Sequence, residues 1–211
     1  MQYPVTLTRQ DRLTVGAIAG IGHKINGEAT LKRYTDGDND PQAKTANNAF
    51  DIPFSYGVGL GWEHSDNLLV GLDFKHELWS ECHTPQYSSA TGEYSPTKGV
   101  YMDRYKVAAG AQYTPGRYER SYLKRMQYKI GAHYSTPYMR INGADGPKEY
   151  GLTAGVGLPI MNNYNSRSTV NVSLQWLRRA PSTASMITEN YFMVNFGLTF
   201  NEQWFMKFRI K

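Results

Sequence analysis

The side chains of this sequence that could do acid–base, nucleophilic or metal chemistry are separated from one another. The five histidines fall on different expected strands or loops, and their spacing matches neither a metal-binding helix nor a zinc knuckle. They are His23, His64, His76, His83 and His133. Cys82 is the only cysteine, which excludes an internal disulfide, and we expect it at a polar surface position in a loop. Cys82 and His83 could bind a soft metal only if a loop folded over them.

One stretch places a histidine between two carboxylates, and its spacing does not suit catalysis. On a strand, Asp73 and Glu77 would share one face while His76 would point to the other. The sequence has no Gly-x-Ser-x-Gly nucleophile motif, and the run GVGLG at 57–61 lies inside an alternating stretch rather than before a helix. We therefore expect no enzymatic activity, no cofactor and no metal.

The elements that would position these side chains are β-strands. About nine stretches alternate apolar and polar residues with a period of two, which is typical of strands with two different faces. In the clearest stretch, 191–200, one face carries Phe192, Val194, Phe196, Leu198 and Phe200. The predicted strands lie near 3–8, 13–21, 54–63, 68–77, 105–113, 125–134, 150–158, 170–176 and 191–200.

The predicted connections alternate between a shorter and a longer set. The shorter ones lie at 9–11, 65–67, 115–119 and 161–167, and the polar longer ones at 26–48, 81–98, 138–147 and 179–189. Short periplasmic turns that alternate with longer extracellular loops are typical of outer-membrane barrels. The sequence therefore predicts an all-β fold, a transmembrane antiparallel β-barrel with about nine to ten strands here.

Composition agrees with a strand-based membrane protein. The chain of 211 residues has a mean hydropathy of −0.55, and no apolar run reaches the roughly 18 residues that a membrane helix needs. Its 16 Tyr, 4 Trp and 8 Phe suit aromatic girdles at the two membrane interfaces. The net charge of +5 is scattered along the chain, so we expect no nucleic-acid partner.

The polar faces of the predicted strands supply the candidate lumen-facing residues. These are Asp73, Lys75, Glu77, Lys106, Gln112, Arg125, Gln127, Lys129, His133, Asn171, Gln175 and Asn195. A soluble β-sandwich or lipocalin-like barrel would also alternate, but it would need a second apolar layer to form a core. The inward faces offer Gly, Ser, Thr, Asn, Lys and Glu instead, which favours the membrane barrel.

Four segments resemble one family of outer-membrane proteins. They are NAFDIPFSYGVGLGW at 48–62, LLVGLDFKHELWS at 68–80, YGLTAGVGLPI at 150–160 and ENYFMVNFGLTFNEQWFMKFRIK at 189–211. In the pattern of residues along their strands they are similar to the FadL/TodX transporters. The resemblance implies a 14-stranded barrel with an N-terminal hatch and passive uptake of long-chain fatty acids or other hydrophobic compounds. This chain would supply its C-terminal part.

The resemblance also shapes our expectations for organisation and partners. We expect barrel strands over 1–200, a periplasmic tail or strand extension over 201–211, and a location in the bacterial outer membrane. The N-terminus has no signal-peptide pattern, so we expect a piece of a longer precursor, or a mature or engineered form. The expected partners are membrane lipid, hydrophobic small molecules and other outer-membrane proteins. The alternative function is a structural or accessory barrel in an outer-membrane assembly, with Tyr87, Tyr94 and Tyr101 as a contact cluster.

Overall fold

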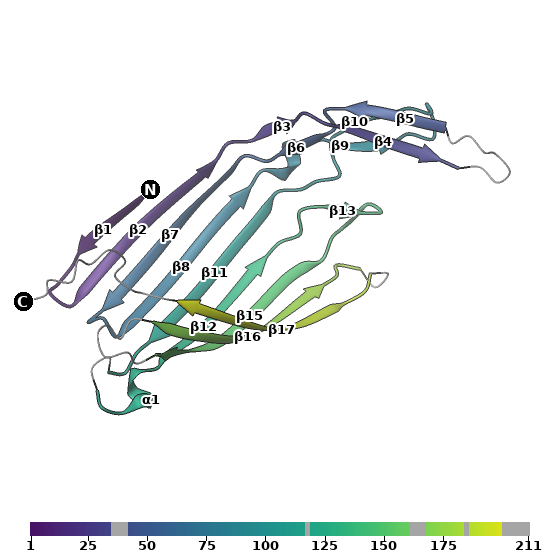
Figure 1. Cartoon of the computed structure of the whole chain (residues 1–211). Helices are drawn as coiled ribbons and strands as arrows, with labels where there is room; N and C mark the ends of the chain where they lie inside the picture. The colour runs from purple at the N-terminus through teal and green to yellow at the C-terminus, as the bar shows by residue number, and fades with distance from the viewer. Residues whose placement is uncertain (35–41, 117–118, 161–167, 184–185, 200–211) are drawn as a thin grey trace, which may run out of the picture.

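A single curved antiparallel sheet of nine strands forms the body of the protein (Figure 1). The computed structural model describes residues 1–34, 42–116, 119–160, 168–183 and 186–199. The strands are, in spatial order, β1 (Gln2–Thr6), β2 (Asp11–Gly20), β7 (Ser55–His64), β8 (Leu68–Glu77), β11 (Arg104–Tyr113), β12 (Gln127–Ser135), β15 (Lys148–Pro159), β16 (Thr169–Ala180) and β17 (Glu189–Thr199). The all-β prediction and its nine strands are confirmed. Among the described residues the sheet does not close into a barrel, because β1 and β17 are not paired.

The register aligns like residues across the sheet. One row of cross-strand partners is apolar from edge to edge: Tyr3, Val15, Leu60, Leu72, Ala109, Ala132, Leu152, Trp176 and Phe192. The neighbouring row is also apolar: Val5, Leu13, Trp62, Val70, Ala111, Ile130, Ala154, Leu174 and Val194. Because side chains alternate along a strand, a register error of one residue would break both rows. We call this side the apolar face and the other side the polar face.

One end of the sheet carries additional small hairpins, and we call it the hairpin end. Between β2 and β7, β3 (His23–Ile25) pairs with β6 (Phe50–Ile52), and β4 (Glu28–Arg33) pairs with β5 (Gln42–Asn47). Between β8 and β11, a short 3-10 helix, η1 (Trp79–Glu81), precedes β9 (Thr84–Tyr87) and β10 (Tyr94–Thr97). Between β12 and β15, β13 (Arg140–Ile141) pairs with β14 (Ala144–Asp145).

These hairpins correct the prediction that 26–48, 81–98 and 138–147 are loops without strands. Their strands are short and polar, so they lack the apolar alternation that identifies a strand in the sequence. They are held by pairing with one another: the strands β5 and β10 lie together, as do β6 and β9. Figure 1 shows β3, β4, β5, β6, β9 and β10 gathered beyond the same end of the sheet.

At the opposite end, the turn end, β1 to β2 and β7 to β8 have short connections. The connection from β11 to β12 covers 114–126 and contains α1 (Tyr122–Arg125), so it is longer than the predicted turn at 115–119. The N–H of Gly116 donates to Lys124 O and the hydroxyl of Tyr128 to Leu123 O, which fixes this helical turn. The predicted turn at 161–167 and the predicted tail at 201–211 lie outside the described residues. No described helix is long and apolar enough to cross a membrane.

The sheet has no apolar core of its own. Among the described residues the buried apolar side chains are Ala29, Ala46, Ala49 and Cys82, all in the connections of the hairpin end. Large apolar side chains stay exposed instead, for example Ile130 at 67% and Phe192 at 81%. Without a covering layer, the strands are held mainly by their backbone hydrogen bonds.

The turn between β7 and β8 gives a test of this register. Ser65 and Asp66 both have positive φ, 49° and 56°, and the N–H of Asn67 donates to His64 O at 3.0 Å, as in a type I′ turn. We expect Ser65→Val to lower the free energy of unfolding by about 1–2 kcal/mol, because a β-branched residue is strained at positive φ. Ser65→Asn should leave it nearly unchanged. The urea midpoint of folding into phospholipid vesicles measures both, and equal midpoints for the two variants would contradict the turn.

Candidate functional site

The candidate lumen-facing residues lie on one face of the sheet. Cross-strand pairing puts Asp73, Lys75, Glu77, Lys106, Gln112, Gln127, Lys129, His133, Asn171, Gln175 and Asn195 on the polar face. Arg125 is the exception, because it belongs to α1 rather than to a strand, where its guanidinium lies 5.7 Å from the centre of the Tyr122 ring. Polar-face residues are more shielded than their apolar-face neighbours along β7, β12 and β15.

A row of glycines crosses the polar face. Gly61, Gly71, Gly110 and Gly131 are successive cross-strand partners in β7, β8, β11 and β12. A Cβ atom added at any of them would meet no atom closer than 3.4 Å, so packing within the described chain does not require glycine there. Gly61, Gly71 and Gly110 line an open cavity of ≈590 Å³, together with Thr14, Asp73, Gln112 and Lys129.

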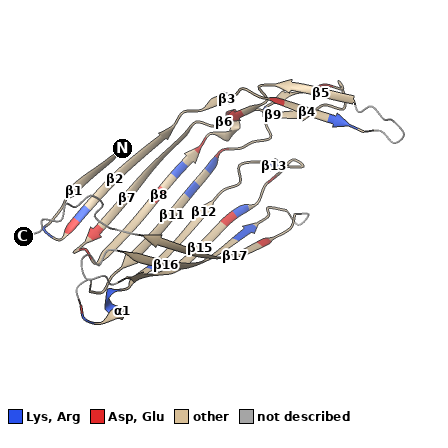
Figure 2. Ribbon diagram, in the orientation of Figure 1, with Lys and Arg blue, Asp and Glu red and all other residues tan. Residues whose placement is uncertain are grey.

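Charged residues occur on both sides of this glycine row, and Figure 2 shows charged positions toward both ends of the strands. Toward the hairpin end, Lys75 donates to Glu77 at 2.7 Å, and Arg179 lies 3.4 Å from Glu149 and 3.5 Å from Glu189. Toward the turn end, Arg12 pairs with Glu63, and Lys129 donates to Asn171 at 2.7 Å. The polar face therefore has a central band of glycine on these four strands, bordered by charged side chains on both sides, which suits water better than an apolar ligand.

The apolar face is bordered by polar aromatic side chains at both ends. At the hairpin end these are Tyr56, Tyr105, Tyr134 and Tyr150, with His76 among them. At the turn end they are Trp62, Tyr113 and Tyr128. His76 is only 7% exposed: its ring stacks on Tyr105 at 4.3 Å, and its Nδ1 lies 2.9 Å from the Tyr56 hydroxyl. His76 thus points to the apolar face, as predicted, and packs as part of the aromatic border.

At the hairpin end, one ion pair joins two of the small hairpins. His83 Nδ1 lies 2.6 Å from Asp51 Oδ2, and the backbone N–H of His83 donates to the same oxygen at 2.9 Å. Burial opposes ionisation of Asp51, but the hydrogen bonds from His83 outweigh it, so the pKa of the Asp51 carboxyl is lowered. This carboxylate therefore stabilises the fold at neutral pH, and the contribution is lost as the pH falls from the ordinary pKa of 3.8 through the lower folded value.

Cys82 does not occupy the polar surface position that the sequence suggested. It is 3% exposed, and burial, with the nearby charge of Asp51, raises the pKa of its thiol. Its neighbour His83 is engaged by Asp51, and no group of three or more His, Cys, Asp or Glu side chains that could hold a metal occurs among the described residues. Cys82 is thus a small packed side chain at the hairpin end.

The three loop tyrosines proposed as one contact cluster belong to two separate places. Tyr87 and Tyr94 are cross-strand partners in the β9–β10 hairpin, where Tyr94 packs against Ala29, Ala46 and Ala49. Tyr101 instead contacts Trp79 and Tyr138, with ring centres 5.4 and 6.3 Å away. The sequence missed this second cluster because its members come from two connections, β8 to β11 for Trp79 and Tyr101 and β12 to β15 for Tyr138. In the sequence, the only indication of this cluster is that its three members are large aromatic residues.

The Asp51–His83 pair can be tested through the single buried thiol. We expect His83→Ala to raise the labelling rate of Cys82 by a thiol reagent at neutral pH roughly tenfold, since the buried Asp51 carboxylate loses its side-chain donor and the hairpins open more often. Asp66→Asn at the turn end, where asparagine tolerates the positive φ, is the control and should leave the rate unchanged. Equal rates in the His83 variant and the unaltered protein would show that the pair does not hold the hairpins together.

Comparison with known proteins corrects the resemblance drawn from strand texture. The BamG family model matches residues 7–211, nearly the whole chain. The FadL/TodX assignment is therefore wrong, and with it the expected 14-stranded transporter and its hatch lose their support. A search of curated proteins found no match.

The matched family bears on location and partners in general terms. BamG implies an outer-membrane-associated location in Gram-negative bacteria and a component associated with the BAM complex. This agrees with the alternative function considered above, an accessory subunit of an outer-membrane assembly. Because the match covers almost its entire length, the chain belongs to the BamG family.

Proposed function

We propose that the protein is a non-enzymatic, integral outer-membrane subunit of the BAM complex, whose nine-stranded sheet spans the membrane as all or part of a β-barrel. Its apolar face contacts lipid and its polar face lines a water-filled lumen. The observation that carries the proposal is the pair of apolar rows that cross all nine strands, over which the described residues place no covering layer.

The dimensions of the apolar face support a membrane environment. Tyr105 and Tyr113 mark the two aromatic borders on β11, and their eight-residue separation corresponds to roughly 27 Å of strand. Outer-membrane barrels have an apolar band about 25 Å tall between aromatic girdles, with tilted strands. Such a band exposed to water would be an aggregation hazard, because monomeric soluble proteins rarely expose apolar patches of this extent.

The edges of the sheet support an assembled state. Nine antiparallel strands leave β1 and β17 running in the same direction, so these two strands cannot close the sheet by one antiparallel ladder. An open edge is not stable in hydrocarbon, because its N–H and C=O groups find no water there. A strand from a partner protein of the outer-membrane assembly would satisfy the free edge of β17.

The lipid-facing assignment predicts opposite outcomes for two adjacent substitutions in β16. Leu174 lies on the apolar face, 61% exposed and midway along the strand, while Gln175 lies on the polar face. We expect Leu174→Arg to destabilise the protein in vesicles by about 2–4 kcal/mol and Gln175→Arg to have little effect, because only the former puts charge into the bilayer. Urea midpoints of folding into vesicles measure the difference. A sheet that does not insert would show two small and similar effects.

The accessory role is tested by photo-crosslinking in cells. A benzophenone side chain at Phe192 or Phe196, both on the edge strand β17, should form adducts with a BAM-complex protein. The same group at Val58, which lies on the apolar face within the sheet, is the control and should meet lipid only. Adducts confined to the chain itself, or the absence of BAM proteins from the adducts of β17, would contradict a partner strand.

A further inference from the structure

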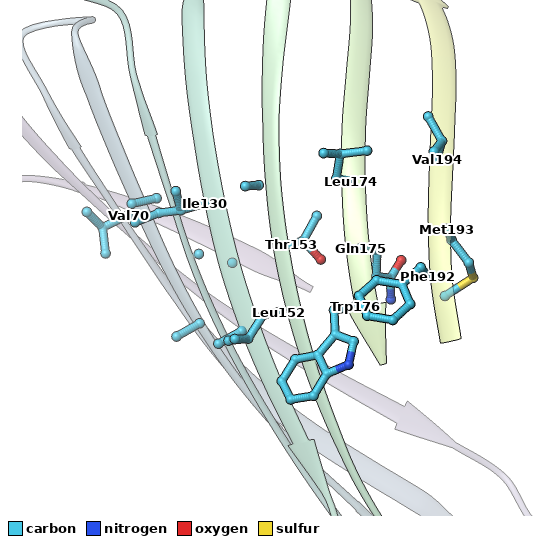
Figure 3. A pocket seen from close by; sticks show the side chains of 16 residues that line it. Val70, Ile130, Leu152, Thr153, Leu174, Gln175, Trp176, Phe192, Met193 and Val194 are labelled. Atoms are coloured by element: carbon cyan, nitrogen blue, oxygen red, sulfur yellow. The ribbon is translucent and has the colours of Figure 1, made fainter. Parts of the chain in front are cut away.

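A groove runs along the apolar face where small side chains replace large ones. Ala109, Ala111, Ala132 and Ala154 form its floor, and its volume is ≈770 Å³. Figure 3 shows Leu152, Leu174 and Trp176 projecting to one side of their strands, and Thr153, Gln175 and Met193 to the other. Val70 and Ile130 lie on one flank of the groove, and Trp176 and Phe192 on the other. We call it the alanine groove.

The alanine groove continues toward the hairpin end into a second hollow of different chemistry. This hollow of ≈700 Å³ shares Ala109, Ala132 and Leu152 with the groove and ends at Tyr134, Tyr150 and Arg178. The rings of Tyr134 and Tyr150 lie 5.1 Å apart. This path has an apolar middle and a polar, cationic end. It therefore matches an amphiphilic ligand, which has an apolar chain and a polar headgroup.

Two cations lie at the polar end of this path: Arg178 lines the hollow, and Lys148 is the cross-strand partner of Ala180, which also lines it. Lys148 and Arg178 are the apolar-face cations of β15 and β16, on adjacent strands, and both are exposed. Neither makes an ion pair among the residues that the structure describes. The adjacent Arg179 differs sharply, because on the polar face it lies 3.4 Å from Glu149 and 3.5 Å from Glu189. Among the described residues, carboxylates pair with the cation on one face and with neither cation on the other.

We propose that this path binds one lipid with an anionic phosphate headgroup, taken from the membrane leaflet at the hairpin end. An acyl chain lies in the alanine groove, and Lys148 and Arg178 bind the phosphate, with the hydroxyls of Tyr134 and Tyr150 available as donors. Charge complementarity selects the occupant: an uncharged apolar partner would leave both cations without a counterion, and a free anion would leave the groove exposed. The inference rests on the proposed membrane-spanning function.

The experiment measures lipid retention by native mass spectrometry of the full chain in detergent. We expect phosphatidylglycerol to be retained in preference to phosphatidylcholine. Lys148→Gln and Arg178→Gln should each lower the phosphatidylglycerol affinity about fivefold, because each cation near the membrane surface contributes at that scale. Arg179→Gln is the matched control and should change nothing, since its partners are the two carboxylates. Equal retention of the two lipids, or an equal loss in the Arg179 variant, would overturn the proposal.

A second pair of variants tests the apolar part of the path. Ala132→Phe should fill the floor of the alanine groove and lower phosphatidylglycerol retention several-fold. Ala17→Phe adds the same bulk on the apolar face of β2, outside the groove, and should not. Equal retention in both variants would overturn the groove as the acyl site. Failure of the membrane-spanning function itself is distinguishable, because then Leu174→Arg and Gln175→Arg would not differ in vesicles.

Discussion

Backbone hydrogen bonding between antiparallel strands is the interaction on which the rest of this structure depends. Burial contributes little, since the buried apolar residues of the described chain are small and lie outside the main sheet. A sheet held in this way gains little from folding in water, where its open groups already have partners. In hydrocarbon the same ladder becomes the only way to satisfy those groups, and the exposed apolar rows become favourable contacts. Lipid would thus take the place of the apolar layer against which the sheet of a soluble protein packs.

The fold and the assignment of faces could be predicted because both follow from a period of two. Each strand of the main sheet alternates over nearly its whole length, so a polar residue such as Gln175 and its apolar neighbour Leu174 are assigned to opposite faces by position alone. Arg125 escaped this reasoning because the apparent alternation continues into α1. There the hydrogen bond from Gly116 to Lys124 O turns the backbone away from the sheet.

Features that depend on contacts between distant segments could not be predicted. The hairpins between β2 and β7 are polar and are fixed by pairing and by the bond between Asp51 and His83, residues that are 32 positions apart. Burial of Cys82 follows from that contact. The family could not be identified from the sequence pattern for a related reason. Strands of all membrane barrels alternate apolar and polar residues, so an alternation shared with a transporter is no evidence of common ancestry.

The glycine row on the polar face has a mechanical consequence. Side chains that crowd a face resist curvature toward it, and four successive strands here lack side chains along one line from Gly61 to Gly131. Curvature of the sheet toward the polar face therefore meets less steric resistance along that line. Any change in the radius of the sheet concentrates there. Neighbouring strands among these four can change their mutual angle along this row while the ladders between them remain intact.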